Sequence, residues 1–192
     1  MRPIAADSGV AAQRIRTIDG MSELPGAFTI RPVAPGDVDG LLALVHELAR
    51  YEREPDAVEM TAEQLHDALF AAGAKLFGHV ATGTSGTGEV IGMALWFCNF
   101  STWRGRHGVY LEDLFVHPEH RRRGIGEALL ATLAKVCVDR GYTRLEWSVL
   151  DWNQPAIDFY RTLGAVGLDE WTVFRLDNEA LAALATRAAE PR

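Results

Sequence analysis

The spacing of apolar residues changes along the chain, and each spacing predicts a different secondary-structure element. From Val38 to Ala49, valine, leucine and alanine recur every three or four positions, as on one face of a helix. Short apolar or alternating runs between turn residues instead predict strands. We expect strands at residues 28–33, 75–81, 89–99, 109–116, 145–150 and 170–176. We expect helices at residues 38–49, 60–69, 124–140 and 154–163, and a terminal helix that starts at Asn178.

Residues at the ends of these elements support the boundaries. Thr61, followed three positions later by Gln64, is the capping-box pattern of a helix start. Gly141 follows one expected helix, and Pro155 stands in the first turn of another, where proline is tolerated. The strand–helix–strand order in the second half implies parallel pairing after an antiparallel hairpin. The pattern therefore predicts an α/β (α+β) fold, in which a mixed sheet, antiparallel and then parallel, is flanked by helices on both faces.

The composition is that of one globular domain. Of the 192 residues, 48% are hydrophobic and 23% are charged, as in an ordinary folded enzyme. No run approaches the roughly 18 apolar residues of a membrane span, and residues 1–27 lack the apolar stretch of a secretory signal. We therefore expect residues 1–27 to be a flexible leader and residues 28–192 to form a single domain with a short C-terminal helix. The protein is expected to be cytoplasmic, without a membrane partner.

Charge and metal-ligating residues narrow the choice of partners. The formal net charge of −7 argues against nucleic acid as a partner, because phosphate binding needs a basic surface, and it is compatible with a cationic substrate. Cys98 and Cys137 lie in apolar patterns and are expected to be buried small side chains rather than a disulfide or metal ligands. His117 and His120 are close in sequence but lack further ligands. We expect no metal site, and a place for either histidine near a phosphate stays open.

The stretch that follows Val116 has the features of a phosphate-binding turn. An expected strand ends there, and Gly124 and Gly126 open a helix, whose first amides are free donors that glycine allows a phosphate to approach. Residues 121–123 add three arginines. The lysine and hydroxyl of a P-loop are absent, and Leu129 replaces the third glycine of a dinucleotide fingerprint. The residues predict a phosphate cradle, although a plain turn with a solvated basic corner also fits them.

The longer pattern around this turn resembles a known family. Val116-x-Pro118-x-x-Arg121-x-x-Gly124-x-Gly126 is similar to the coenzyme A motif of the GNAT superfamily of N-acetyltransferases. Residues 153–164 resemble the second motif of that superfamily, and the resemblance covers about residues 28–176. Residues 49–52, 111–116 and 152–155 look like the diamine acetyltransferase group, which includes spermidine/spermine and thialysine acetyltransferases.

The resemblance implies an acetyltransferase that uses acetyl-CoA as co-substrate, forms a homodimer and needs no metal. Its substrate would be a small primary amine: a polyamine, a diamine or a lysine-like side chain. The positions that would bind acetyl-CoA are Leu114, Phe115, Val116, Arg121, Arg122, Arg123, Gly124, Ile125, Gly126, Glu127, Asn153, Pro155, Ala156 and Tyr160. The positions that would contact the amine are Tyr51, Glu52, Glu112 and Asp113. The chain departs from the group at Arg122 and Gln154, where glycine and glutamate are expected.

The implied reaction assigns roles to these residues. An alkyl ammonium titrates near ~10.4, so its proton must be removed before the amine attacks the thioester. Glu112 is the first candidate for this step and Asp113 the alternative, but a regular strand would point the two to opposite faces unless a bulge intervenes. Backbone amides near Leu114 or Phe115 would stabilise the developing oxyanion. Tyr160 would protonate the leaving thiolate.

Plainer roles and other functions remain open at this stage. Glu112 also fits a solvated or salt-bridged charge, Glu52 a surface charge, and Tyr160 a core aromatic side chain packed on Ile157. A protein lysine or N-terminal acetyltransferase would carry the same cofactor motif. A catalytically silent acyl-CoA sensor would carry it too, although Tyr160 and Glu112 together argue against a silent module.

Overall fold

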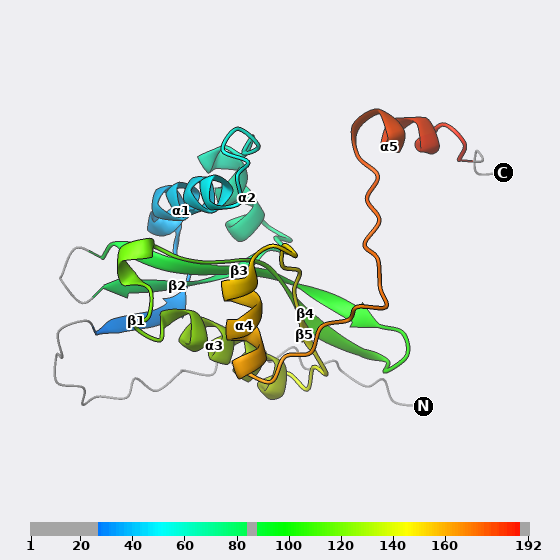
Figure 1. The fold of residues 1–192 in the computed structure, drawn as a ribbon. Helices are drawn as coiled ribbons and strands as arrows, with labels where there is room; N and C mark the ends of the chain where they lie inside the picture. Colours follow the sequence, from blue (N-terminus) through cyan, green and yellow to red (C-terminus); the bar gives the residue numbers. More distant parts are fainter. Residues whose placement is uncertain (1–26, 84–87, 189–192) are drawn as a thin grey trace, which may run out of the picture. The chain divides into compact units, whose positions relative to one another are not determined.

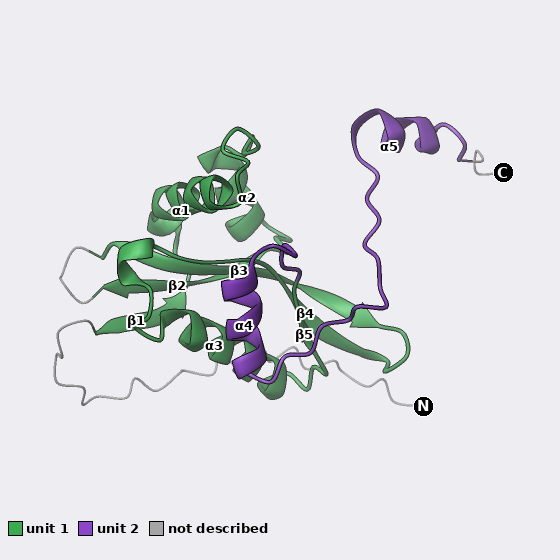
Figure 2. Ribbon diagram, viewed as in Figure 1, with its two compact units in different colours: residues 1–147 green, residues 148–192 purple. Residues whose placement is uncertain are grey.

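A computed structural model describes residues 27–83 and 88–188 of the chain. The expected leader, apart from Ala27, and residues 84–87 of the expected hairpin loop lie outside this range. The chain divides into two compact units, residues 1–147 and residues 148–192 (Figure 2). Each unit is described by itself. Among the described residues, no helix is long and apolar enough to cross a membrane.

The first unit is built on a five-stranded sheet in the order β1-β2-β3-β4-β5 (Figure 1). Its strands are β1 (Phe28–Pro32), β2 (Phe77–Gly83), β3 (Val90–Ser101), β4 (Arg106–Val116) and β5 (Leu145–Glu146). Neighbours from β1 to β4 pair antiparallel, and β5 pairs parallel to β4. The predicted mixed sheet is therefore confirmed, although β5 is shorter than the expected strand at residues 145–150.

Three helices cover the two faces of this sheet. Helices α1 (Val38–Tyr51) and α2 (Ala62–Phe70) lie on one face and α3 (Ile125–Asp139) on the other (Figure 1). Between α1, α2 and the sheet lies a core of fully or nearly fully buried apolar residues: Val38, Leu41, Leu44, Leu65, Val80, Met93, Leu95 and Phe115. Because every member is removed from water, burial of these side chains stabilises the position of α1 against the sheet.

Local sequence explains where several of these elements begin. Thr61 accepts a hydrogen bond from the amide of Gln64 at 3.2 Å, and the Gln64 side chain accepts one from the Thr61 amide at 2.8 Å. The predicted capping box at α2 is thus confirmed. Before α1, the buried Asp37 carboxylate accepts two hydrogen bonds from Arg31 of β1, at 2.6 and 2.7 Å. The guanidinium holds the pKa of Asp37 below its ordinary value and ties α1 to the sheet.

Both cysteines are free thiols. Cys137 on α3 is buried, and its Sγ donates a hydrogen bond to the carbonyl oxygen of Arg144 at 3.4 Å. Cys98 on β3 is half-buried, with its Sγ 3.7 Å from the Tyr142 hydroxyl. These contacts fit the expected structural role of both side chains.

The turn from β4 into α3 has an unusual backbone. After a short 3-10 helix (Pro118–His120), Arg122 has φ of 61° and Gly124 has φ of 79°. Glycine adopts such angles freely, whereas a residue with a Cβ is strained there. The sequence therefore departs from the resembled family at Arg122, at a position whose conformation favours the family's glycine.

The second unit contains α4 (Gln154–Thr162) and α5 (Asn178–Ala185). The segment between them has a turn at residues 169–170, where the Trp171 amide donates to the Leu168 carbonyl oxygen at 3.0 Å, and it contains no strand (Figure 1). The prediction of a strand at residues 170–176 is wrong, because no residue of that described segment belongs to a strand. Its apolar and β-branched residues are typical of a strand, but a strand also needs hydrogen-bonding neighbours, which composition alone does not supply.

Replacement of Arg122 tests the backbone strain. Arg122→Gly is expected to raise the free energy of unfolding by up to about 1 kcal/mol, because relief of the left-handed backbone outweighs the extra freedom of glycine in the unfolded chain. Arg123→Gly is the matched control, since Arg123 has no positive φ, and should lower the free energy of unfolding by about 0.4–1 kcal/mol. Urea unfolding followed by circular dichroism measures both. Equal losses in the two variants would show that Arg122 is not strained.

Candidate active site

The start of α3 forms an anion-binding surface. The Ala128 amide donates to the Gly124 carbonyl oxygen at 2.9 Å, which is the first hydrogen bond of the α-helical ladder. The amides of residues 125–127 come before it and have no acceptor four residues earlier within the helix. Left-handed Arg122 and Gly124 bend the preceding backbone as in anion-binding nests, and the helix dipole adds partial positive charge. This arrangement suits a pyrophosphate, as predicted from Gly124 and Gly126.

A glycine on β3 brings this helix start close to the sheet. A Cβ on Gly92 would lie 3.1 Å from Cγ2 of Ile125 and 3.3 Å from the carbonyl oxygen of Phe115. A larger side chain at Gly92 would therefore push the first turn of α3 away from the end of β4. Sequence analysis missed Gly92. The available signal was a glycine inside an expected strand, which often marks close approach of another backbone.

The three arginines of the turn have different surroundings. The Nε atom of Arg121 donates to the carbonyl oxygen of Val116 at 3.0 Å, and its guanidinium carbon lies 5.1 Å from the Tyr51 ring centroid and 5.2 Å from that of Phe115. Its side chain is thus held against two aromatic rings by cation–π attraction. Arg122 and Arg123 are exposed, and both side chains remain candidates for contact with phosphate. Arg121 joins the turn to Tyr51, the last residue of α1, a contact that the sequence did not indicate.

A β-bulge lies in β4 at Glu112. Leu95 pairs with Asp113 and Trp96 pairs with Leu111, so Glu112 is an extra residue without its own partner position on β3. In a regular strand, Glu112 and Asp113 would point to opposite faces, whereas a bulge re-aims side chains locally. Sequence analysis allowed both carboxylates to serve one site only if a bulge intervened. The β4 strand contains such a bulge.

The carboxyl groups of Glu52, Glu112 and Asp113 form an acidic cluster. Burial, followed by the charges of Glu112 and Glu52, raises the pKa of Asp113 to about 6. Burial also raises the pKa of Glu52, which caps the C-terminus of α1. Like charges with incomplete solvation are unfavourable in the absence of a counter-charge. A cation beside Asp113 would offset the burial and the like charges that raise the pKa of this carboxyl group.

The pairing of β4 with β5 ends before the cradle begins. The parallel pair consists of Val109 with Leu145 and Tyr110 with Glu146. On the other side of β4, pairing with β3 continues through Leu114 and Phe115 to Val116. Along residues 111–116, the backbone groups that face the β5 side thus lie beyond that strand ladder. Contact of the backbone of Leu114 to Val116 with an extended ligand stays a prediction.

The second unit carries the remaining predicted site residues. Asn153 is buried, and its Oδ1 accepts a hydrogen bond from the amide of Ala156 at 3.4 Å, which caps the start of α4. Pro155 stands in the first turn, as predicted. Tyr160 is half-buried on α4, with its ring centroid 5.4 Å from that of Phe159. The side chain of Asn153 thus has a structural task in the helix, and contact of these residues with the cofactor stays a prediction.

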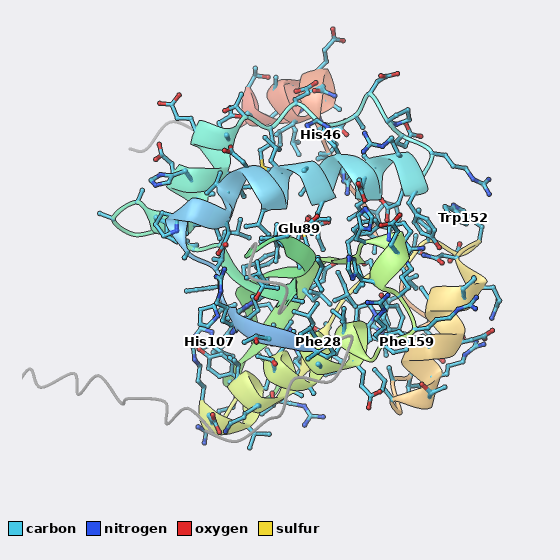
Figure 3. The ribbon with its side chains drawn as sticks, turned by 90° about the vertical axis from the view of Figure 1, so that its left-hand side faces the viewer. Phe28, His46, Glu89, His107, Trp152 and Phe159 are labelled. Carbon is cyan, nitrogen blue, oxygen red and sulfur yellow. The ribbon has the colours of Figure 1, made fainter. Side chains whose placement is uncertain are left out.

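A cavity of about 340 Å³ lies elsewhere in the first unit, and none of the predicted site residues lines it. It is bounded by the first part of α1 and by Glu89, Val90 and His117; the Glu89 side chain can be seen beside α1 (Figure 3). Nε2 of His117 lies 3.6 Å from a Glu47 carboxylate oxygen, and its Nδ1 is buried without a partner among the described residues. The His117 side chain therefore contacts α1 through Glu47.

The histidines do not gather into a metal site in the described part of the chain. His46 on α1 and His107 on β4 lie well apart (Figure 3). His117 and His120 come near each other, with ring centroids 5.7 Å apart. Among the residues that the structure describes, no group of three or more histidine, cysteine or acidic side chains is arranged to hold a metal ion.

Comparison with known proteins agrees with this geometry. The Acetyltransferase (GNAT) family matches residues 41–165. Thialysine N-epsilon-acetyltransferases of Bos taurus and Caenorhabditis elegans are 41% and 36% identical, over 81% and 80% of this chain and 96% and 94% of their own length. A solved structure, an integron cassette protein from the mobile metagenome of V. cholerae, matches with a TM-score of 0.70 and 26% identity, covering 86% of this chain and 99% of its own. By these matches, the chain, which has free amides at the start of the helix that follows β4, belongs to the GNAT family of acetyltransferases.

Proposed function

We propose that the chain transfers the acetyl group of acetyl-CoA to the terminal amine of a small diamine or lysine-like molecule. The observation that carries the proposal is the acidic cluster. In it, the charges of Glu112 and Glu52 raise the pKa of Asp113, which lies on β4, the strand that leads into the phosphate-binding turn. A protonated amine would supply a positive charge to this cluster. Two relatives named thialysine N-epsilon-acetyltransferases, which align over most of the chain, point to the same class of substrate.

The residues of the cradle fit the cofactor assigned to them. The amides of Ile125, Gly126 and Glu127 would hold the pyrophosphate, with the backbone of Arg121 to Gly124 and the charges of Arg122 and Arg123 beside them. Backbone groups of residues 114–116 would bond the pantetheine arm, and Asn153, Pro155 and Ala156 of α4 would contact the cofactor. Side-chain contact from Arg121 is the weakest part of this assignment, because its guanidinium already packs on Tyr51 and Phe115.

The chemistry requires a base, an oxyanion donor and an acid. At neutral pH, roughly one alkyl amine in a thousand is unprotonated, so Glu112 or Asp113 would accept the amine proton directly or through water. An amide near Leu114 or Phe115 would stabilise negative charge on the thioester oxygen. The Tyr160 hydroxyl would give its proton to the leaving thiolate. Tyr51 and Glu52 would orient the amine.

We also propose that the protein works as a homodimer, and that its partners are acetyl-CoA and the amine rather than nucleic acid or a membrane. The resemblance to the diamine acetyltransferase group supports the dimer. The net charge of −7 argues against nucleic acid and is compatible with a cationic amine.

A panel of acceptors tests the proposed substrate class. Purified protein, acetyl-CoA and each of thialysine, lysine, ornithine, spermidine and a lysine-containing peptide are followed by release of free thiol. We expect kcat/KM to be higher for the four small amines than for the peptide. We expect Glu112→Gln to lower kcat/KM by about 10²–10⁴-fold if Glu112 is the base. Turnover with the peptide alone would overturn the small-amine assignment, and silence with every acceptor would favour an acyl-CoA sensor.

Tyr160→Phe tests the proposed acid. The variant should keep its fold, because only a hydroxyl is removed, and lose roughly 10²–10⁴-fold in kcat, because the thiolate must leave without that proton. Tyr142→Phe is the control, since Tyr142 bears the same hydroxyl next to Cys98 and has no proposed role. Thiol release at saturating acetyl-CoA and amine measures both variants. A wild-type kcat in Tyr160→Phe would remove Tyr160 from the mechanism.

The acidic cluster also predicts a pH dependence. Because the pKa of Asp113 is raised to about 6, Asp113 becomes neutral as the pH falls below this value and no longer attracts an ammonium group. At pH 8, Asp113→Asn should raise the KM for the amine by about tenfold, the equivalent of ~1.4 kcal/mol. The KM ratio of variant to wild type should shrink toward 1 as the pH falls through 6. A ratio that stays constant from pH 5 to pH 8 would contradict a role for the Asp113 charge.

A further inference from the structure

Asn99, Arg144 and Glu146 form a polar cluster that joins β3 to the start of β5. Nδ2 of Asn99 donates to Oε2 of Glu146 at 2.7 Å, and Nε of Arg144 lies 2.9 Å from the same oxygen. Nη2 of Arg144 also donates to the carbonyl oxygen of Phe100 at 3.4 Å. The side chains of Arg144 and Glu146 are 33% and 31% exposed. The polar cluster is therefore held by its own contacts and still open to a ligand.

A glycine inside β4 makes room for this polar cluster. A Cβ on Gly108 would lie 2.6 Å from Cγ of Arg144 and 2.6 Å from Oδ1 of Asn99. Any other residue at this position would therefore displace both side chains. Glycine weakens the interior of a strand, and it often marks a place that another group approaches closely. Here that group is the aliphatic part of Arg144, so β4 is shaped to let this side chain cross it.

The polar cluster lies on the same face of the sheet as Asp113. On β3, Leu95 belongs to the core that α1 covers, and strand alternation places Asn99 on the same face. Asp113 is the partner of Leu95 on β4, and Glu146 accepts a hydrogen bond from Asn99. One strand spacing and two to three residues along β4 separate Asp113 from Glu146, which puts their Cα atoms roughly 8–11 Å apart.

Two aromatic rings lie between Asp113 and the polar cluster. Phe97 and Tyr110 are partners across β3 and β4, with ring centroids 5.1 Å apart. Both side chains are half-buried, and Tyr110 is also the partner of Glu146 on β5. Such rings offer an apolar surface to the methylene groups of an alkyl chain. This face thus presents a carboxyl group, an aromatic surface and the polar cluster in that order.

The polar cluster has one acceptor and one donor to spare. Oε2 of Glu146 is occupied by its two neighbours, whereas Oε1 has no hydrogen-bond partner among the described residues. Nη1 of Arg144 likewise has none in that part of the chain. An α-amino acid carries both complementary charges on one carbon: an ammonium group for Glu146 and a carboxylate for Arg144. A simple diamine lacks the carboxylate and would bring a second positive charge close to Arg144.

We propose that the polar cluster binds the α-amino and α-carboxyl groups of the substrate, and that Arg144 selects amino acids with a side-chain amine over diamines without a carboxylate. This inference rests on the proposed function and narrows its substrate class. The side-chain amine lies at Asp113, and the methylene groups lie on the rings of Phe97 and Tyr110. The α-carboxylate then reaches Arg144. Lysine has a length comparable to the separation of Asp113 from Glu146.

Lysine and cadaverine, which is lysine without its carboxylate, test the role of Arg144. With saturating acetyl-CoA, wild type should have a kcat/KM about tenfold higher for lysine, the effect of one hydrogen bond between charged groups. Arg144→Gln should lower kcat/KM about tenfold for lysine and leave it unchanged or higher for cadaverine. Lys135→Gln removes an exposed positive charge from α3, on the other face of the sheet, and should change neither.

Two outcomes of this comparison contradict the proposal. Equal kcat/KM for lysine and cadaverine in wild type overturns it, and this measurement needs no variant to fold. An equal loss for both acceptors in Arg144→Gln also overturns it, because a merely structural role in the sheet would affect both acceptors alike. Circular dichroism checks that the variants keep their fold.

ε-Aminocaproate, which is lysine without its α-amine, tests the contact with Glu146. Glu146→Gln keeps an oxygen for the Asn99 amide and loses the negative charge. It should lower kcat/KM about tenfold for lysine and leave it unchanged or higher for ε-aminocaproate. Glu63→Gln, at an exposed position of α2, is the control and should change neither. The same loss with both acceptors would overturn the ammonium contact.

Equilibrium binding separates this inference from the proposed function. Isothermal titration of lysine and of cadaverine into wild type and Arg144→Gln, without acetyl-CoA, measures recognition in the absence of transfer. Binding of lysine that depends on Arg144, together with no acetylation of any acceptor, would contradict the activity and leave the inference standing. Acetylation of lysine and cadaverine with equal kcat/KM would support the activity and overturn the inference.

Discussion

The close approach of α3 to the end of β4 is the constraint on which the rest of the first unit depends. Free amides at a helix start bind an anion only if the helix begins where the ligand lies. Here Gly92 leaves room for Ile125 against the sheet, and Gly124 supplies the left-handed residue that starts the helix. Arg122, with a Cβ in the same left-handed region, shows that the chain keeps this turn despite local strain.

The acidic cluster depends on a second departure from regular structure. Without the bulge at Glu112, strand alternation would send Glu112 and Asp113 to opposite faces of β4. With it, Asp113 lies under the influence of both Glu112 and Glu52, which approaches from the C-terminus of α1. One strand therefore provides the acidic side chains in its middle and leads to the phosphate-binding amides at its end. A substrate amine and an acetyl donor would meet along a single element.

Local patterns in the sequence predicted much of this arrangement. The capping box of Thr61 and Gln64 and the helix that opens after Gly124 follow from residues close together in the chain. The bulge was named only as a condition, because its position depends on pairing with Leu95 and Trp96 of β3. The contacts of Gly92 with Ile125 and of Arg121 with Tyr51 join distant segments and have no local signature. The strand prediction at residues 170–176 was wrong for the same reason: a local run of strand-forming residues does not specify a neighbouring strand.

The guanidinium of Arg121 touches both halves of the candidate site. It belongs to the turn that would receive the acetyl donor, and it packs on Tyr51, which ends the helix that carries Glu52. If occupancy of the turn moves this side chain, the aromatic ring moves with it, and the affinity for the amine changes. Thermodynamic linkage then requires the amine to change the affinity for the acetyl donor by the same factor. Through this one cation–π contact, the two substrates would thus alter each other's affinity by an equal factor.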